Sequence, residues 1–146
     1  FDDPSGKRLR AWLGVTKEIF YSDKRIGIFP MGLCFPGTGP GGDNPPRAQC
    51  AEKWRGSMMA ALQDVELTLV LGRYAIAWHF PEMTNKPITE AVRGSAAAMS
   101  GVFVLPHPSP RNNRWLKQND WFEAEVVPRI QSRVSKILEV PTEGSQ

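Results

Sequence analysis

The sequence predicts an α/β protein: a three-layer αβα domain with a central, mostly parallel sheet. Three short apolar segments alternate with helical ones, at residues 25–29, 65–71 and 102–105. Runs of consecutive apolar residues are typical of parallel strands that helices cover on both faces. The chain has 146 residues, of which 41% are apolar and 23% are charged, as in one globular domain. We therefore expect residues 1–146 to form a single domain.

The first thirty residues predict two short helices and then the first strand. Leu9, Trp12 and Leu13 have the spacing of one apolar helix face, and Gly14 ends that helix. Thr16 caps a second helix over residues 17–21. The first strand follows and runs into Pro30. A compact helical start is therefore expected to lead directly into the sheet.

A loop rich in glycine and proline follows the first predicted strand. Nine of the fifteen residues from 32 to 46 are glycine or proline, so neither a helix nor a central strand persists there. Loops of this length in compact domains are usually functional or disordered. A cysteine near each end, Cys34 and Cys50, favours the functional interpretation. Asp43, the acid of this loop, is interpreted as a turn former.

Residues 46–63 predict a helix, whose expected inner face is Cys50, Trp54, Met58, Ala61 and Leu62. The strand at residues 65–71 then leads through Gly72 into a helix at residues 73–78. A further helix is expected around residues 88–99, before the last strand.

The final helix is predicted from about residue 119 to residue 138. Its apolar stripe consists of Phe122, Val126, Ile130, Val134, Ile137 and Leu138. Pro128 lies inside this stretch, and proline removes a helix hydrogen bond. We therefore expect a kink or two abutting helices at Pro128.

Charge and length exclude some classes of function and leave others open. The apolar stretches are far shorter than the roughly 20 residues of a membrane span, so we expect no membrane association. Two cysteines and the lack of a signal segment indicate a cytoplasmic setting. The net charge of +3 allows a polyanionic partner. Basic residues cluster at Lys7, Arg8 and Arg10 and at Arg111, Arg114 and Lys117, as binding patches or ordinary solvated faces.

Ligands of parallel sheets bind at the carboxyl ends of the strands, which here precede residues 30–34, Gly72 and His107. His107 follows a buried strand and has a proline on each side, which fixes its backbone. An imidazole there could be structural, or it could hydrogen-bond an oxygen on which negative charge accumulates. Arg111 and Arg114 follow as candidate phosphate contacts, while the indole of Trp115 is expected to pack rather than stack.

A metal site built from both histidines and both cysteines is not favoured. His79, His107, Cys34 and Cys50 match none of the usual spacings of zinc ligands. The sequence also carries no Walker, GxGxxG or GxSxG motif.

The run His107-Pro108-Ser109 after a strand resembles the HPS motif of the uracil-DNA glycosylase superfamily. Fifteen residues separate Cys34 from Cys50, which looks like the second cysteine pair of the iron–sulfur branch. Phe1 and Gly6 resemble the segment that carries the base-stacking aromatic, and residues 71–75 look like that family's strand–Gly–helix unit.

This resemblance implies the family fold and a DNA-repair activity, the hydrolysis of the N-glycosidic bond of a deaminated base, most simply uracil. His107 would stabilise the departing base, Phe1 would stack on it and Ser109 would bind a phosphate. The loop that enters DNA would comprise Arg111, Asn112, Asn113 and Arg114. The family's uracil-reading asparagine would fall on Pro30, which makes Asn44 the candidate substitute. DNA is the expected partner of a monomeric protein.

The resemblance further implies a 4Fe-4S cluster, for which Cys34 and Cys50 would be two of four ligands. The other cysteine pair and the water-positioning motif of that family precede the stacking aromatic. We therefore expect them upstream of Phe1. Two alternatives remain open: a DNA- or lesion-binding module of the same fold without catalysis, and a metal or redox sensor based on the cysteine pair.

Overall fold

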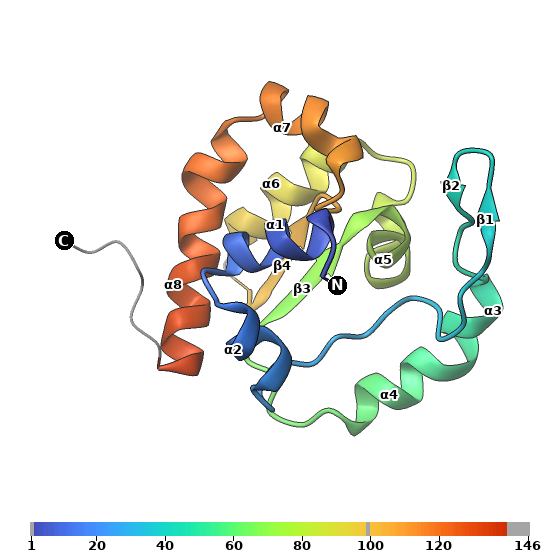
Figure 1. The fold of residues 1–146 in the computed structure, drawn as a ribbon, viewed down its shortest axis with the longest axis horizontal. Helices are drawn as coiled ribbons and strands as arrows, with labels where there is room; N and C mark the ends of the chain where they lie inside the picture. The colour runs from blue at the N-terminus through green and yellow to red at the C-terminus, as the bar shows by residue number, and fades with distance from the viewer. Residues whose placement is uncertain (1, 99, 140–146) are drawn as a thin grey trace.

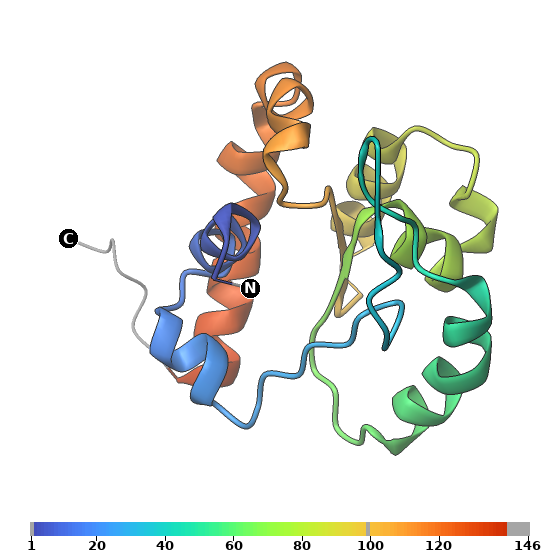
Figure 2. The ribbon, with the colours of Figure 1, turned by 45° about the vertical axis from the view of Figure 1, so that its right-hand side comes forward.

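The fold is that of a computed structural model, which describes residues 2–98 and 100–139. Strands β3 (Thr68–Leu71) and β4 (Val102–Leu105) form a parallel pair with Thr68 opposite Val102 and Leu71 opposite Leu105. Figure 2 shows helices α1, α2 and α8 on one side of this pair and α5 and α6 on the other. The predicted α/β class and the parallel pairing of these two strands are confirmed.

The predicted strand at residues 25–29 is wrong. Residues 26–30 run as an extended segment outside both sheets of the described structure. The guanidinium of Arg55 donates to the carbonyl oxygens of Phe29 at 3.2 Å and Pro30 at 3.4 Å. A side chain rather than a neighbouring strand therefore binds these backbone acceptors. The second predicted strand is also shorter than expected, because β3 begins at Thr68.

Helices α1 (Pro4–Leu13) and α2 (Lys17–Ser22) form as predicted. The carboxylate of Asp3, rather than the Ser5 hydroxyl, caps α1 by accepting the N–H of Gly6 at 2.8 Å. Gly14 ends α1 with a left-handed φ of 67°. Glycine adopts that conformation without the strain that a Cβ would cause.

The glycine- and proline-rich segment contains a small hairpin. Strands β1 (Thr38–Gly39) and β2 (Gly42–Asp43) pair antiparallel. Asn44 braces the base of this hairpin, because its backbone N–H donates to Gly37 at 2.9 Å and its amide donates to Pro36 at 3.3 Å.

A continuous helical run follows the hairpin: α3 (Ala48–Cys50), the π-helical η1 (Ala51–Arg55) and α4 (Gly56–Ala61). The predicted inner face is wrong by about one residue. Ala51 and Arg55 are buried, whereas the Trp54 side chain is 47% exposed. The buried phase follows Arg55, whose guanidinium reaches the carbonyls of residues 29 and 30 and the ring of His79.

The remaining helices occupy the predicted stretches. They are α5 (Gly72–His79), α6 (Ile88–Ala98), α7 (Asn113–Gln118), the π-helical η4 (Phe122–Val126) and α8 (Val127–Leu138). Met99, the predicted end of α6, lies outside the described residues. Pro128 lies in the first turn of α8, where its missing N–H costs no hydrogen bond, so the predicted break occurs just before it.

The core lies between the sheet and the helices α1 and α8. Phe122 and Ile130 are completely buried, and the Trp12 ring meets the Phe122 ring edge-on at 5.0 Å. The indole N–H of Trp12 donates to Glu123 at 2.9 Å, which satisfies the polar end of a buried side chain. Among the described residues, no helix has the length and apolar character needed to cross a membrane.

Candidate active site

The parallel register of the sheet brings Gly72 and His107 together. Because Leu71 and Leu105 are partners, the residues that follow them leave the sheet at the same edge (Figure 1). Gly72 has a φ of 78°, and a Cβ at this position would lie 3.3 Å from the Cβ of His107. The turn from β3 into α5 therefore needs both the backbone freedom and the small size of glycine.

The imidazole of His107 has a defined hydrogen-bonding state. The backbone N–H of Ser109 donates to its Nδ1 at 3.2 Å. An amide nitrogen always carries its hydrogen, so Nδ1 accepts and the neutral ring holds its proton on Nε2. Desolvation lowers the pKa of His107 below its usual value, while the carboxylate of Asp3 partly offsets this effect. At neutral pH the ring is therefore a neutral donor through Nε2.

The backbone around His107 is held on several sides. Pro106 is fully buried and Pro108 is buried, which anchors the segment to the core. The side-chain amide of Asn112 donates to the carbonyl of His107 at 2.7 Å. The hydroxyl of Ser109 accepts the N–H of Arg111 at 3.3 Å and caps the short helix η3 (Pro110–Asn112). These contacts preorganise the histidine.

Arg8 of α1 clamps the same loop. Its guanidinium donates to the carbonyls of Pro108 and Ser109, both at 3.2 Å, and to the side chain of Asn113 at 2.7 Å. The sequence gave no sign of this role beyond the basic cluster that contains Arg8. Asp3, which acts electrostatically on His107, was also missed. The N-terminal end of α1 is thus part of the site.

Arg111 connects the His107 loop to the β1–β2 hairpin. Its guanidinium donates to the carbonyl of Gly41 at the hairpin tip. Gly42 has a φ of 110°, and a Cβ there would overlap the guanidinium. The two unusual segments of the sequence, the hairpin and the loop after β4, therefore meet in space.

The other candidate residues occupy different positions in the site. Asn113 and Arg114 are exposed at the start of α7, and Asn112 is half-buried beneath them. Asn44 is exposed at the base of the hairpin. Phe1 lies outside the described residues. Packing of Trp115 is confirmed, because its N–H donates to Thr89 and its ring lies 5.8 Å from that of Phe122.

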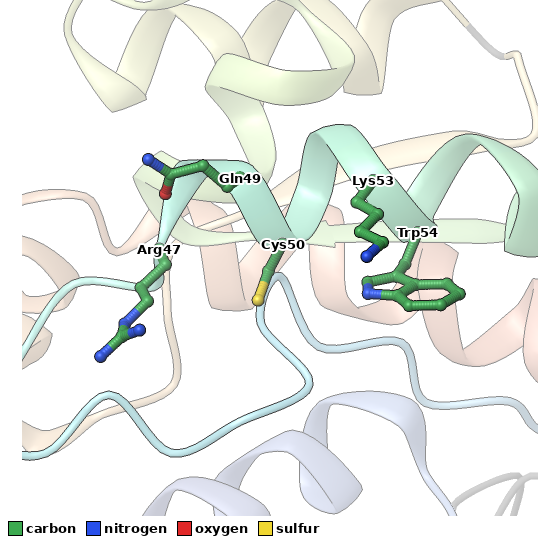
Figure 3. Close-up of a pocket in the computed structure, with 5 residues that line it drawn as sticks. All are labelled: Arg47, Gln49, Cys50, Lys53 and Trp54. Carbon is green, nitrogen blue, oxygen red and sulfur yellow. The ribbon is translucent and has the colours of Figure 1, made fainter.

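Cys34 and Cys50 are both free thiols, the first exposed and the second half-buried. Cys50 lines an open hollow of about 570 Å³ (Figure 3). Within residues 2–98 and 100–139, no three histidine, cysteine, aspartate or glutamate side chains gather as metal ligands would. An iron–sulfur cluster needs four ligands, so the described residues do not hold one by themselves.

His79 belongs to a separate buried cluster. Its Nε2 lies 3.0 Å from a guanidinium nitrogen of Arg55, and that nitrogen can only donate. Desolvation, together with the charge of Arg55, lowers the pKa of His79. The neutral ring therefore accepts through Nε2, which makes His79 a structural histidine.

A comparison with protein-family models supports the resemblance noted in the sequence. Residues 1–131 match the model of the uracil DNA glycosylase superfamily. The match includes the end of both parallel strands, the hairpin and the whole His107 loop. Members of this family are typically glycosylases that act on DNA. The chain therefore belongs to the uracil DNA glycosylase superfamily.

Proposed function

We propose that this protein hydrolyses the N-glycosidic bond of uracil, or of a related deaminated base, in DNA. The observation that carries the proposal is the neutral imidazole of His107, whose Nδ1 is occupied by the Ser109 N–H and whose Nε2–H remains a donor. This donor lies at the carboxyl end of β4, where ligands of parallel sheets bind.

The chemistry requires a group that stabilises a departing base. When the bond between C1′ and the base nitrogen breaks, its electron pair leaves with the base, and negative charge spreads onto the base carbonyl oxygens. A fixed N–H donor aimed at such an oxygen lowers the barrier because it needs no reorganisation. Water supplies the hydroxyl that ends on C1′, and its proton neutralises the released base. In this scheme His107 acts as a donor and does not itself become the base that activates water.

The surroundings of His107 are consistent with DNA as the substrate. Arg114 and Asn113 are exposed beside the loop, and the Arg111 guanidinium lies between the loop and the hairpin tip. We propose that Arg111 and Arg114 bind backbone phosphates and that Ser109 contacts a phosphate next to the flipped nucleotide. Phe1 is proposed to stack on the base, and Asn44 to contact it.

Replacement of His107 tests the proposal. The His107→Ala and His107→Gln proteins should release uracil from an oligonucleotide about 10² to 10³ times more slowly, the usual cost of losing one preorganised donor. DNA affinity should change little. A His79→Gln protein is the matched control, because His79 lies in the Arg55 cluster rather than at the strand end. Uracil release by His107→Ala at the normal rate would refute the assignment.

The same experiment separates the enzyme from a DNA-binding module of the same fold. A module without catalysis would bind the oligonucleotide but release no base, whichever residue occupies position 107. We propose the enzyme because a binding module has no need for the fixed tautomer that the Ser109 amide imposes on His107.

A further inference from the structure

The hollow next to the hairpin has the composition of a nucleic-acid contact. Arg47, Gln49, Cys50, Lys53 and Trp54 line it, and all come from the start of α3 and from η1 (Figure 3). The Lys53 ammonium lies 5.1 Å from the centre of the Trp54 ring. Trp54 is 47% exposed, although an indole usually has most of its surface buried. The hollow therefore combines an accessible aromatic face with two cations.

The exposure of this face follows from the helical phase of η1. Ala51 and Arg55 take the buried side, so Cys50 and Trp54 point outward. Residues 47–55 carry three cationic side chains and one carboxylate, that of Glu52. The local charge is therefore positive and complements a phosphate chain.

The hollow lies within reach of DNA held at the His107 loop. The Arg111 guanidinium binds the Gly41 carbonyl, and the chain needs six residues from Gly41 to arrive at Arg47. Six extended residues span at most about 20 Å. At the 3.4 Å rise of one strand of a duplex, that distance corresponds to roughly six nucleotides. One DNA molecule can therefore contact both places.

We propose that this face binds an unpaired stretch of the DNA strand that flanks the base at His107. A base stacks on Trp54, and Arg47 and Lys53 hold the adjacent phosphates. Proteins that bind single strands use this combination of an aromatic platform and a positive groove. The inference rests on the proposed function for its partner, since a glycosylase brings DNA to the His107 loop. It adds a second contact, which gives the protein a preference for targets near single-stranded DNA.

The test compares uracil-containing duplexes by fluorescence anisotropy. One is blunt, one has a single-stranded tail of about two nucleotides, and one a tail of about ten, longer than the reach estimated above. Tails are placed on either end of the strand. The long tail should tighten binding to the unmodified protein by about 5-fold or more, the lower end of one base–aromatic stack, and the short tail should not.

Three variants identify the residues responsible. Trp54→Ala should abolish the gain from the long tail, and Trp54→Phe should retain most of it. The double variant Arg47→Gln/Lys53→Gln should lower the salt dependence of tail binding by about 1.4 log units per log unit of salt, 0.7 for each phosphate contact. Lys136→Gln removes one charge from α8, on the opposite side of the molecule in Figure 1, and should retain the gain.

The outcomes for the surface and for the enzyme are separate. A long tail that adds no affinity, or a gain that survives Trp54→Ala, would overturn the surface even if the protein releases uracil. Loss of the gain in Trp54→Ala would support the surface even if no uracil is released, because binding rather than catalysis is measured.

Discussion

Gly72 offers a sharp test of how the strand ends build the site. A Gly72→Ala substitution places a Cβ 3.3 Å from the Cβ of His107, at a backbone φ of 78°. A left-handed conformation costs a residue with a Cβ about 1–2 kcal/mol. The contact is also tighter than ordinary packing, so His107 must move by a few tenths of an ångström.

Two effects should follow from this substitution. The free energy of unfolding should fall by about 1–2 kcal/mol in urea denaturation. Uracil release should slow by about 10-fold, because a displacement of 1 Å at a reacting centre can cost about 10²-fold and this shift is smaller. DNA affinity should be unchanged, since the cationic side chains around the loop are untouched.

Gly94→Ala is the matched control. Gly94 lies within α6, and a Cβ there would have no neighbour within 4 Å. Alanine is the better helix former by about 1 kcal/mol, so this protein should be slightly more stable and fully active. If Gly72→Ala and Gly94→Ala proteins have equal stability and equal uracil release, the argument for a close approach of Gly72 to His107 is refuted.

Three further predictions address charge, loop geometry and metal content. The pKa values of His79 and His107 are lowered in the folded state, so the unfolded chain binds more protons below about pH 6.5, and the free energy of unfolding should fall as the pH drops from 7 to 5. Urea denaturation at each pH checks this, and a His79→Gln protein should show a shallower decline. Arg8→Gln should slow uracil release by about 10-fold, because the Pro108 and Ser109 carbonyls lose their clamp, and Arg8→Lys should restore activity only in part; a normal rate for Arg8→Gln would contradict the clamp. Iron analysis of residues 1–146 should find less than one four-iron cluster per chain, because Cys34 and Cys50 supply two thiolates, whereas a chain that includes the expected upstream cysteines should absorb visible light if it belongs to the iron–sulfur branch.

Several features of the fold could be predicted because their signals are local. The consecutive apolar residues of β3 and β4 predicted strands that pair in parallel. Gly14 and Thr16 marked helix ends through their own backbone and side-chain chemistry. Pro128 predicted the break before α8 for the same reason. The sequence also identified His107 as the residue that leaves a buried strand between two prolines.

The tertiary structure decided everything that depends on a distant partner. The segment at residues 26–30 has the composition of a strand, yet its carbonyls bind Arg55, about 25 residues further along the chain. That contact sets the buried phase of η1 and thereby exposes Trp54. Arg8 reaches the His107 loop across 100 residues. Helical spacing records which residues share a face, but it does not record which acceptor a charged side chain will find, because that depends on how separate segments pack.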